Sequence, residues 1–369
     1  MKSKVSIVEC DSYDLEKVYK SIKKSLDDIG FKFKEGSNVL IKPNVLSANK
    51  PDKHVTTNPV IVDAVCKILK ENKCNITIGE SSGSFNTSNA LKVAGITDIA
   101  KKHGAKLKPF ESSELVKIKV DGVVLKEAYF AKDVFDADLV INLPKLKTHT
   151  LTKFTCCVKN LYGTMPGAYK HQLHLKAPDD FNFCHLIIDR YSLFQPGLNI
   201  VDAIIGLEGN GPAAGPPKPT GLIITGEDAV ATDIICQKVI GLNPLDVFTT
   251  KHAIDRGLFS SIDNVELIGN LKIVKYKLPN TISKAPTFLK WLFHKSMISK
   301  PYLKKESCTK CGICAKVCPV DCITFDPYPV FDREKCISCY CCSEMCNDKS
   351  IDLKGSKLVR VFNKIREVL

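Results

Sequence analysis

Short apolar runs alternate with amphipathic stretches along residues 1–145, and this alternation predicts repeated strand–helix units. Strands are expected at residues 5–8, 39–41, 76–78 and 138–143. Helices are expected where apolar positions recur at a helical period, first at Leu15, Val18, Ile22, Leu26 and Ile29, before Gly30. Further helices are expected from Pro59 to Leu69 and from Ala90 to Lys102. Units of this kind predict an α/β fold with a mostly parallel, doubly wound sheet.

Polar residues gather at three of the expected strand ends. Ligands of such sheets bind beyond the carboxyl ends of the strands. The three segments are Lys42-Pro43-Asn44, Glu80-Ser81-Ser82-Gly83 and Pro144-Lys145-Leu146-Lys147-Thr148-His149. Each segment taken singly fits a turn or a helix cap, but together at one sheet edge they predict a pocket.

The third segment leads into a helix expected over residues 152–161, so cations and a helix N-terminus would face one space. This combination predicts an anion site. Its expected binding residues are Lys42, Asn44, Lys145, Lys159 and Asn160. Lys147 and His149 are the expected catalytic residues, because a histidine can exchange a proton near neutral pH. The alternative is a solvated lysine face beside a turn histidine.

The sequence of these segments resembles the domain of unknown function 362 family. The resemblance covers residues 1–275 approximately, and it rests on these matching stretches: Lys42-Pro43-Asn44, Asn142 to His149, Val158-Lys159-Asn160-Leu161-Tyr162-Gly163, Gly209-Asn210-Gly211-Pro212 and Ala231-Thr232-Asp233. Members of that family often carry a ferredoxin module. The resemblance therefore implies an iron–sulfur protein, but it implies no particular reaction.

A Gly/Pro-rich loop at residues 206–217 is a further candidate for ligand binding. It follows an expected strand at residues 199–202 and could cradle an anion with its backbone. It matches neither the P-loop pattern nor a clean dinucleotide fingerprint, so a turn or a lid is the simpler interpretation. Whether it binds a ligand stays open.

Two runs of cysteine near the C-terminus have the spacing with which bacterial-type ferredoxins hold two [4Fe-4S] clusters. In that arrangement the fourth ligand is exchanged between the runs. The expected ligands are therefore Cys308, Cys311, Cys314 and Cys346 for cluster 1, and Cys336, Cys339, Cys342 and Cys318 for cluster 2. A pair of zinc sites is the alternative, but two identical registers of four cysteines argue against it. Cys322 and Cys341 fall outside the spacing and are interpreted as packing or spare thiols.

The two runs are related by a weak repeat of 28 residues, from Cys308 to Cys336, which predicts a duplicated module with a short hairpin over each cluster. The second run departs from the usual pattern, because Asn347 stands where a proline is common. These features predict three parts: an α/β domain over residues 1–277, a basic aromatic connector over 278–304 and a two-cluster module over 305–369. The connector could lie on a membrane surface, but packing against a domain is the commoner role.

Composition favours a folded protein of the reducing cytoplasm. The chain has 17 cysteines without a disulfide framework, no long apolar run and no signal-like N-terminus. Its formal charge is +13, but lysine supplies nearly all of it and no nucleic-acid motif accompanies it. The surplus charge better suits an acidic redox partner or an anionic substrate.

Two classes of function remain open from the sequence. The first is ferredoxin-type electron transfer, in which two clusters carry single electrons to or from a ligand of the larger domain or a partner enzyme, as in an iron–sulfur oxidoreductase. The second is a non-redox enzyme or binding domain for an anionic substrate, with a structural or regulatory ferredoxin module. Two clusters in series favour the first class, because a structural role would need only one.

Overall fold

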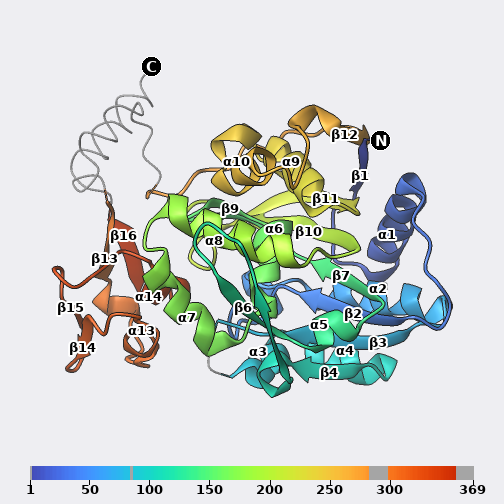
Figure 1. Ribbon diagram of the computed structural model, residues 1–369. Helices are drawn as coiled ribbons and strands as arrows, with labels where there is room; N and C mark the ends of the chain where they lie inside the picture. The colour runs from blue at the N-terminus through green and yellow to red at the C-terminus, as the bar shows by residue number, and fades with distance from the viewer. Residues whose placement is uncertain (1, 84–85, 282–297, 355–369) are drawn as a thin grey trace.

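The computed structural model describes residues 2–83, 86–281 and 298–354 (Figure 1). A ten-stranded sheet forms the centre of the large domain, in the order β12-β1-β11-β10-β7-β2-β3-β4, while β8 pairs with β10 and with β9. The strands of this sheet are β1 (Ser3–Glu9), β2 (Asn38–Pro43), β3 (Asn75–Glu80), β4 (Lys106–Pro109), β7 (Leu139–Leu143), β8 (Lys145–His149), β9 (Lys153–Thr155), β10 (Leu198–Leu207), β11 (Pro217–Gly226) and β12 (Val265–Ile268).

Five neighbouring strands, from β10 through β7, β2 and β3 to β4, run parallel to one another. β11 runs antiparallel to both β10 and β1, so the sheet is mixed but mostly parallel. The expected fold class is therefore confirmed. The parallel half matters for function because the carboxyl ends of its strands meet at one edge.

Helices cover both faces of the sheet (Figure 1). They are α1 (Leu15–Ile29), α2 (Pro59–Glu71), α3 (Thr87–Val93), α4 (Ile96–His103), α5 (Asp133–Asp136), α6 (Cys157–Asn160), α7 (Gly167–Lys176), α8 (Asp180–Leu193), α9 (Ala229–Val239) and α10 (Phe248–Asp255). Side chains of α1 and α2 pack in one apolar core, and those of α8 and α9 pack in a second. Adjacent residues of β10 show the two faces, since Ile200 joins the first core and Val201 the second. A separate hairpin consists of β5 (Leu115–Lys119) and β6 (Glu127–Ala131).

The sequence pattern predicted α1 well. Its expected apolar positions Val18, Ile22 and Leu26 are buried, and the Asp14 carboxylate accepts a hydrogen bond from the Lys17 amide at the N-terminus. Gly30 ends the helix with φ of 75°, a left-handed conformation that glycine adopts without steric cost.

Two of the expected helices differ in the structure. The segment expected to run from Ala90 to Lys102 is divided into α3 and α4, because Gly95 between them has φ of 78°. The prediction of a helix over residues 152–161 was wrong for the first part of this segment, where β9 pairs antiparallel with β8. The four β-branched threonines at positions 148, 150, 152 and 155 favour extended backbone here, and only Cys157–Asn160 remains α-helical as α6.

The small module is a duplicated unit, as the repeat predicted. Its elements are β13 (Lys300–Leu303), α13 (Ile313–Lys316), β14 (Ile323–Phe325), β15 (Pro329–Phe331), α14 (Cys341–Glu344) and β16 (Ile351–Lys354). β14 pairs with β15 in the hairpin expected for the first repeat. The hairpin expected for the second repeat was wrong, because β16 pairs with β13, a strand that precedes the first cysteine run. Backbones with positive φ recur at the repeat distance, in the pairs Lys310 and Ser338, Gly312 and Tyr340, and Asp321 and Lys349.

The sheet of this module begins at Lys300, before the expected boundary at residue 305, because β13 supplies the partner strand of β16. Most of the expected aromatic connector, residues 282–297, lies outside the described residues.

Candidate functional site

A cavity of about 100 Å³ lies at the carboxyl ends of β2 and β3, between the large domain and the small module. Lys42 and Glu80 come from these two strand ends. The small module contributes Cys341, Glu344 and Met345 to the opposite wall. We call this cavity the interdomain pocket. It is the strand-end pocket that the sequence predicted, completed by a wall that the sequence did not predict.

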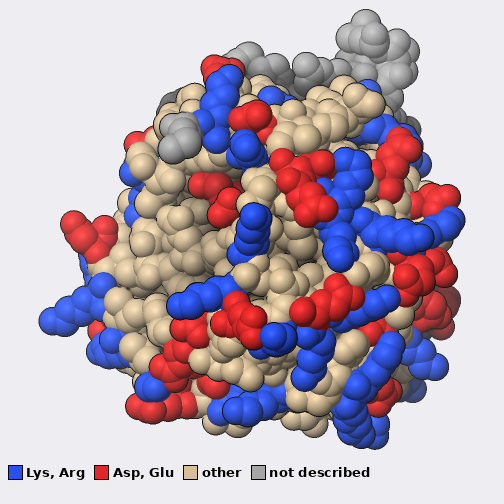
Figure 2. Space-filling model, turned by 90° about the vertical axis from the view of Figure 1, so that its right-hand side faces the viewer, with Lys and Arg blue, Asp and Glu red and all other residues tan. Residues whose placement is uncertain are grey.

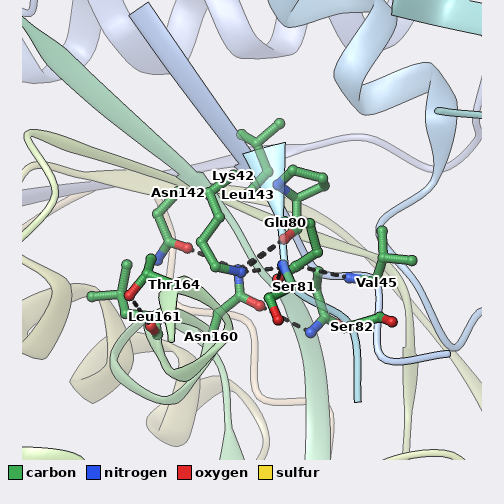
Figure 3. Close-up of polar contacts among 12 residues, drawn as sticks. Lys42, Val45, Glu80, Ser81, Ser82, Asn142, Leu143, Asn160, Leu161 and Thr164 are labelled. Atoms are coloured by element: carbon green, nitrogen blue, oxygen red, sulfur yellow. Dashed lines mark hydrogen bonds and ion pairs between the residues drawn. The ribbon is translucent and has the colours of Figure 1, made fainter. Parts of the chain in front are cut away.

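Lys42 and Glu80 form a buried ion pair at the base of the pocket (Figure 3). Lys42 Nζ lies 2.9 Å from Glu80 Oε2, which also accepts a hydrogen bond from the Val45 amide. The Ser81 amide donates to the other carboxylate oxygen. Burial lowers the pKa of Lys42 and raises that of Glu80, and the charge of each partner opposes the shift of the other. The two charges therefore compensate each other, and the pair fixes the position of both strand ends.

The three other lysines of the pocket, Lys147, Lys159 and Lys170, have no ion pair within 4.0 Å among the described residues. Lys170 Nζ instead donates to Ser81 and Ser82, which leaves Lys147 and Lys159 as the candidates for a ligand. Lys147 is 1% exposed, and its Nζ donates to Asn44 Oδ1 at 2.6 Å. Burial lowers its pKa to about 7, and the positive charges of Lys145 and Lys159 act in the same direction. Burial also lowers the pKa of Lys159. The charge of the Glu344 carboxylate acts on both lysines, although neither lies within ion-pair distance of it. Two buried ammonium groups thus face one carboxylate, and this excess of positive charge suits the binding of an anion.

A chain of asparagine side chains orients the partner of Lys147. Asn44 Nδ2 donates to Asn160 Oδ1, and Asn160 Nδ2 donates to Asn142 Oδ1. Asn142 Nδ2 in turn donates to Asn199 Oδ1 on β10. The side-chain NH2 groups of Asn44, Asn160 and Asn142 thus each donate to the next asparagine. This orients the side chain of Asn44 so that its carbonyl oxygen points toward Lys147.

His149 is a neutral hydrogen-bond donor in this pocket. Its Nδ1 accepts from the backbone amides of Leu151 and Thr152, at 3.0 and 3.3 Å, so the ring proton must be on Nε2. Burial, together with the charges of two neighbouring lysines, holds its pKa well below 6.5. Its Nε2 lies 3.3 Å from Oε1 of Glu344, in the small module. These contacts suit a donor to a ligand, and they do not support the expected proton exchange near neutral pH.

Lys145 belongs to a different contact, outside the lining of the interdomain pocket. Its Nζ lies 2.8 Å from Asp202 Oδ2 and 2.7 Å from the Tyr13 hydroxyl. The same carboxylate accepts from the Asn58 amide, at the start of α2. Lys145 therefore links the sheet to α2, and the structure does not bring it together with the other expected binding residues.

The N-terminus of α6 is already occupied by a carboxylate of the protein. Asp233 accepts from the amides of Cys157 and Val158, at 2.7 and 3.1 Å. The ligand atoms of Cys156, Cys157 and Asp233 also lie within 4.8 Å of one another, but the two amides engage both carboxylate oxygens. The expected role of this helix end in binding a ligand anion is therefore wrong, because an internal side chain fills the position.

Sequence reasoning assigned no role in the site to three charged residues of the pocket, which are Glu80, Lys170 and Glu344. Glu80 stood in a recognised strand-end segment, so that signal was present. Lys170 comes from α7, and its Nζ donates to the Ser81 carbonyl; burial lowers its pKa to about 8. Glu344 lies within the second cysteine run. Neither Lys170 nor Glu344 carries a sequence signal, because only the docking of distant elements brings them to the sheet edge.

The structure brings the expected cluster ligands together in two sets. One cavity of the module is lined by Cys308, Cys311, Cys314 and Cys346, which we call the outer set. A second cavity is lined by Cys318, Cys336, Cys339 and Cys342, which we call the inner set. Each cavity takes three thiols from one run and one from the other. This is the exchange that a two-cluster ferredoxin requires, so the residues present fit the cofactor.

Equivalent hydrogen bonds reach the last cysteine of each run. The Cys322 amide donates to Cys318 Sγ at 3.4 Å, and the Ser350 amide donates to Cys346 Sγ at 3.2 Å. Cys322 and Ser350 are thus the same position of the two repeats, although the Cys322 thiol also lines the inner cavity. The spare thiol Cys341 lines both the inner cavity and the interdomain pocket. The side chain of Cys341 therefore separates the inner cavity from the interdomain pocket.

The Gly/Pro-rich loop holds the small module against the large domain. Asn210 Nδ2 donates to Asp352 Oδ1, and Lys349 Nζ donates to the Gly215 carbonyl. Pro212 of this loop also lines the interdomain pocket. These contacts give the loop a docking role.

Asn347, which replaces the usual proline after the second run, serves the same purpose. Its side-chain oxygen accepts from Ser47 Oγ at 3.0 Å, across the junction. A proline could not form this contact. The departure from the ferredoxin pattern therefore has a structural reason in this chain.

Acidic and basic side chains are interspersed on the face of the large domain that points away from the small module (Figure 2). This face thus lacks the single-sign surface that nucleic-acid binding requires. Among the described residues, no helix has the length and apolar character needed to span a bilayer.

Two family profiles match separate parts of the chain. The profile of the domain of unknown function DUF362 matches residues 39–238, and that of the 4Fe-4S binding domain matches residues 301–324. A thylakoid-associated protein of Synechocystis is 30% identical over 253 residues, covering 68% of this chain and 78% of that protein.

Among solved structures, the lactate racemase apoprotein from Thermoanaerobacterium thermosaccharolyticum is similar with a TM-score of 0.42 and 14% identity. The similarity covers 66% of this chain and 58% of the length of that one. On the extent of the profile match and of the cyanobacterial relative, the chain belongs to the DUF362 family and carries a 4Fe-4S binding domain at its C-terminal end.

Proposed function

We propose that this protein is an iron–sulfur oxidoreductase of the reducing cytoplasm that exchanges single electrons with an anion bound in the interdomain pocket. The observation that carries the proposal is the position of Cys341, whose side chain lines both the inner cysteine cavity and the pocket. An electron carrier and a ligand would thus be separated by one side chain.

The outer and inner sets would each hold one [4Fe-4S] cluster through four thiolates. Bound clusters of this type supply one-electron transfer, at a potential set partly by hydrogen bonds to the sulfurs. Cys311 of the outer set is exposed, whereas Cys339 and Cys342 of the inner set are buried. We therefore assign the outer set to exchange with a redox partner protein and the inner set to exchange with the pocket.

The ligand is held in this proposal by Lys147 and Lys159, because Lys42 is paired with Glu80 and Lys170 donates to Ser81 and Ser82. Lys42 and Asn160 form the neighbouring wall and fix its shape. An anion is favoured because charge-assisted hydrogen bonds would compensate two buried ammonium groups. The small volume of the cavity suits a compact molecule.

Lys147 is also the group that we assign to proton transfer. Its pKa of about 7 lets the ammonium group give up or take a proton near neutral pH. His149 donates from Nε2 and helps to orient the ligand. The sequence predicted both residues as catalytic. In this proposal Lys147 is the acid or base, and His149 is a hydrogen-bond donor that orients the ligand.

Electron transfer to the pocket can be tested in anaerobically reconstituted protein. Small carboxylates and phosphates would be added to dithionite-reduced protein, and reoxidation of the clusters by an added one-electron acceptor, ferricyanide, would be followed by absorbance and EPR. We expect a binding anion to change the rate of reoxidation or the EPR spectrum in the parent. The double variant Lys147→Ala with Lys159→Ala should lose this response and keep its iron content.

A matched control is the pair Lys32→Ala with Lys119→Ala, which removes two exposed lysines remote from the pocket. It should behave as the parent does. A pocket variant that responds to anions as strongly as the parent would rule out the proposed site. A response that leaves cluster reoxidation unchanged while a non-redox reaction proceeds would favour the alternative, in which the ferredoxin module is structural or regulatory.

A further inference from the structure

Two polar atoms of the interdomain pocket lack a hydrogen-bond partner within the part of the chain that the structure describes. They are His149 Nε2 and Glu344 Oε1, and both are buried. The two atoms lie 3.3 Å apart, but their orientation does not satisfy a hydrogen bond. A buried donor and a buried acceptor that both stay unpaired destabilise the protein, because each loses its hydrogen bonds to water and gains none in return. Such a pair points to a group that arrives with the ligand.

The chemistry of the missing group follows from the two atoms. His149 Nε2 carries the ring proton, because Nδ1 accepts two backbone hydrogen bonds, so it needs an acceptor. The Glu344 carboxylate needs a donor. A single oxygen atom can stand at about 2.8 Å from both atoms, since they are so close together. A hydroxyl group both accepts and donates, whereas an ammonium group only donates.

We propose that Glu344 is a specificity-determining residue, and that the ligand of the pocket is a hydroxyl-bearing anion. This inference rests on the proposed function, because Lys147 and Lys159 hold the anionic group. The hydroxyl lies to one side of the contact between His149 and Glu344, within reach of both atoms, and both of these side chains line the same cavity as the two lysines. The small module thus selects the ligand as well as supplying the electron carrier.

The position of Glu344 makes it suitable for this task. It is the last residue of α14, one turn after Cys341 and two residues after Cys342 of the inner set. Holding the inner set therefore also fixes the helix that presents Glu344. On the other side, β8 fixes His149, whose ring is held by the two backbone amides. The two groups come from separate domains and meet only when the module is docked.

The test is calorimetric titration of the anaerobically reconstituted full chain with matched anions. Glycolate and acetate form one pair, 3-hydroxypropionate and propionate a second, and 2-hydroxyethyl phosphate and ethyl phosphate a third. The carboxylate and phosphate arms identify the anionic group. In the series that binds, the parent should favour the hydroxylated member by about tenfold or more, as expected for a hydrogen bond to a charged group.

Glu344→Ala should reduce this preference to about twofold or less, while Glu344→Gln, which keeps an acceptor oxygen, should retain part of it. Glu334→Ala, at an exposed position of the same module, should leave the preference unchanged. Iron content and circular dichroism would verify that each variant keeps its clusters and fold.

Three outcomes would overturn the proposal. Equal affinity of the parent for both members of every binding pair would contradict the proposed recognition of a hydroxyl group. It would not contradict the proposed binding of an anion in the pocket. Tighter binding of glycine than of glycolate would show that an ammonium group is preferred. Binding of none of the anions in any series would overturn the proposed function, and the hydroxyl inference with it.

Discussion

The outer and inner cysteine sets share one backbone design but face different surroundings. Positive φ angles, short helices and an amide-to-sulfur hydrogen bond recur at the same positions of the two repeats. The outer set nevertheless has an exposed thiol in Cys311, whereas α14 of the inner set packs against the interdomain pocket. A duplicated frame can thus hold two equal cofactors, while the neighbouring domain decides which of them serves a ligand.

Equivalent ligand substitutions should separate these two roles most clearly. Cys314→Ala and Cys342→Ala remove the same position of the two repeats, and each should lower the iron content from about eight to about four per chain. Only Cys342→Ala should also weaken anion binding, by about tenfold or more, because Cys342 lies in the helix that presents Glu344. Iron assay, EPR and calorimetry check the pair. Equal loss of anion affinity in both variants would show that the distinction between outer and inner sets is wrong.

The buried ion pair at the base of the pocket should contribute more to stability than an exposed ion pair on the surface. Glu80→Ala should lower the free energy of unfolding by about 3–5 kcal/mol, because it leaves the buried Lys42 ammonium unpaired. Glu35→Ala breaks the exposed pair with Lys73 and should cost less than about 1 kcal/mol. Urea titrations followed by circular dichroism would measure both. Similar costs would mean that the base of the pocket is more hydrated than its burial indicates.

Anion binding should depend on pH through Lys147. Its pKa of about 7 means that the ammonium charge is present below this pH and is lost as the pH rises above it. Affinity for an anion should therefore fall above pH 7, by up to about tenfold per pH unit, and bound anion should move the midpoint to higher pH. Lys147→Arg should flatten the profile, because arginine stays charged. A flat profile in the parent would argue against Lys147 as the titrating ligand.

The smallest effect is expected at the spare thiol that has a counterpart in the other repeat. Cys322→Ser places in the first repeat the residue that Ser350 provides in the second. The amide hydrogen bond to Cys318 Sγ comes from the backbone, so it should persist, and both clusters should be retained with little change in potential. Cys341→Ala should also retain both clusters. Loss of a cluster EPR signal in either variant would show that the ligands are misassigned.

The sequence predicted the elements whose signals are local. The helix over α1 followed from its apolar period and its terminal Gly30, and the parallel sheet followed from alternating strands and helices. The cysteine spacing predicted which four thiols share each cavity, because a cubane cluster demands a fixed local loop and one exchanged ligand. Lys42, Asn44, Lys147, His149, Lys159 and Asn160 were also expected at one site, since parallel strand ends share an edge, and all of them line the pocket.

Only the tertiary structure decided how those residues are used. Lys145 and Lys147 lie two residues apart on one strand, yet Lys145 forms an ion pair with Asp202, while Lys147 faces the pocket and has no ion pair within the part of the chain that the structure describes. The tautomer of His149 depends on the turn that follows it, and Glu344 reaches the site from a separate module. Charge state and contact depend on burial and on partners distant in sequence, and no spacing along the chain encodes these. The chain therefore specified the chemical groups of the site, and the docking of the two domains specified their roles.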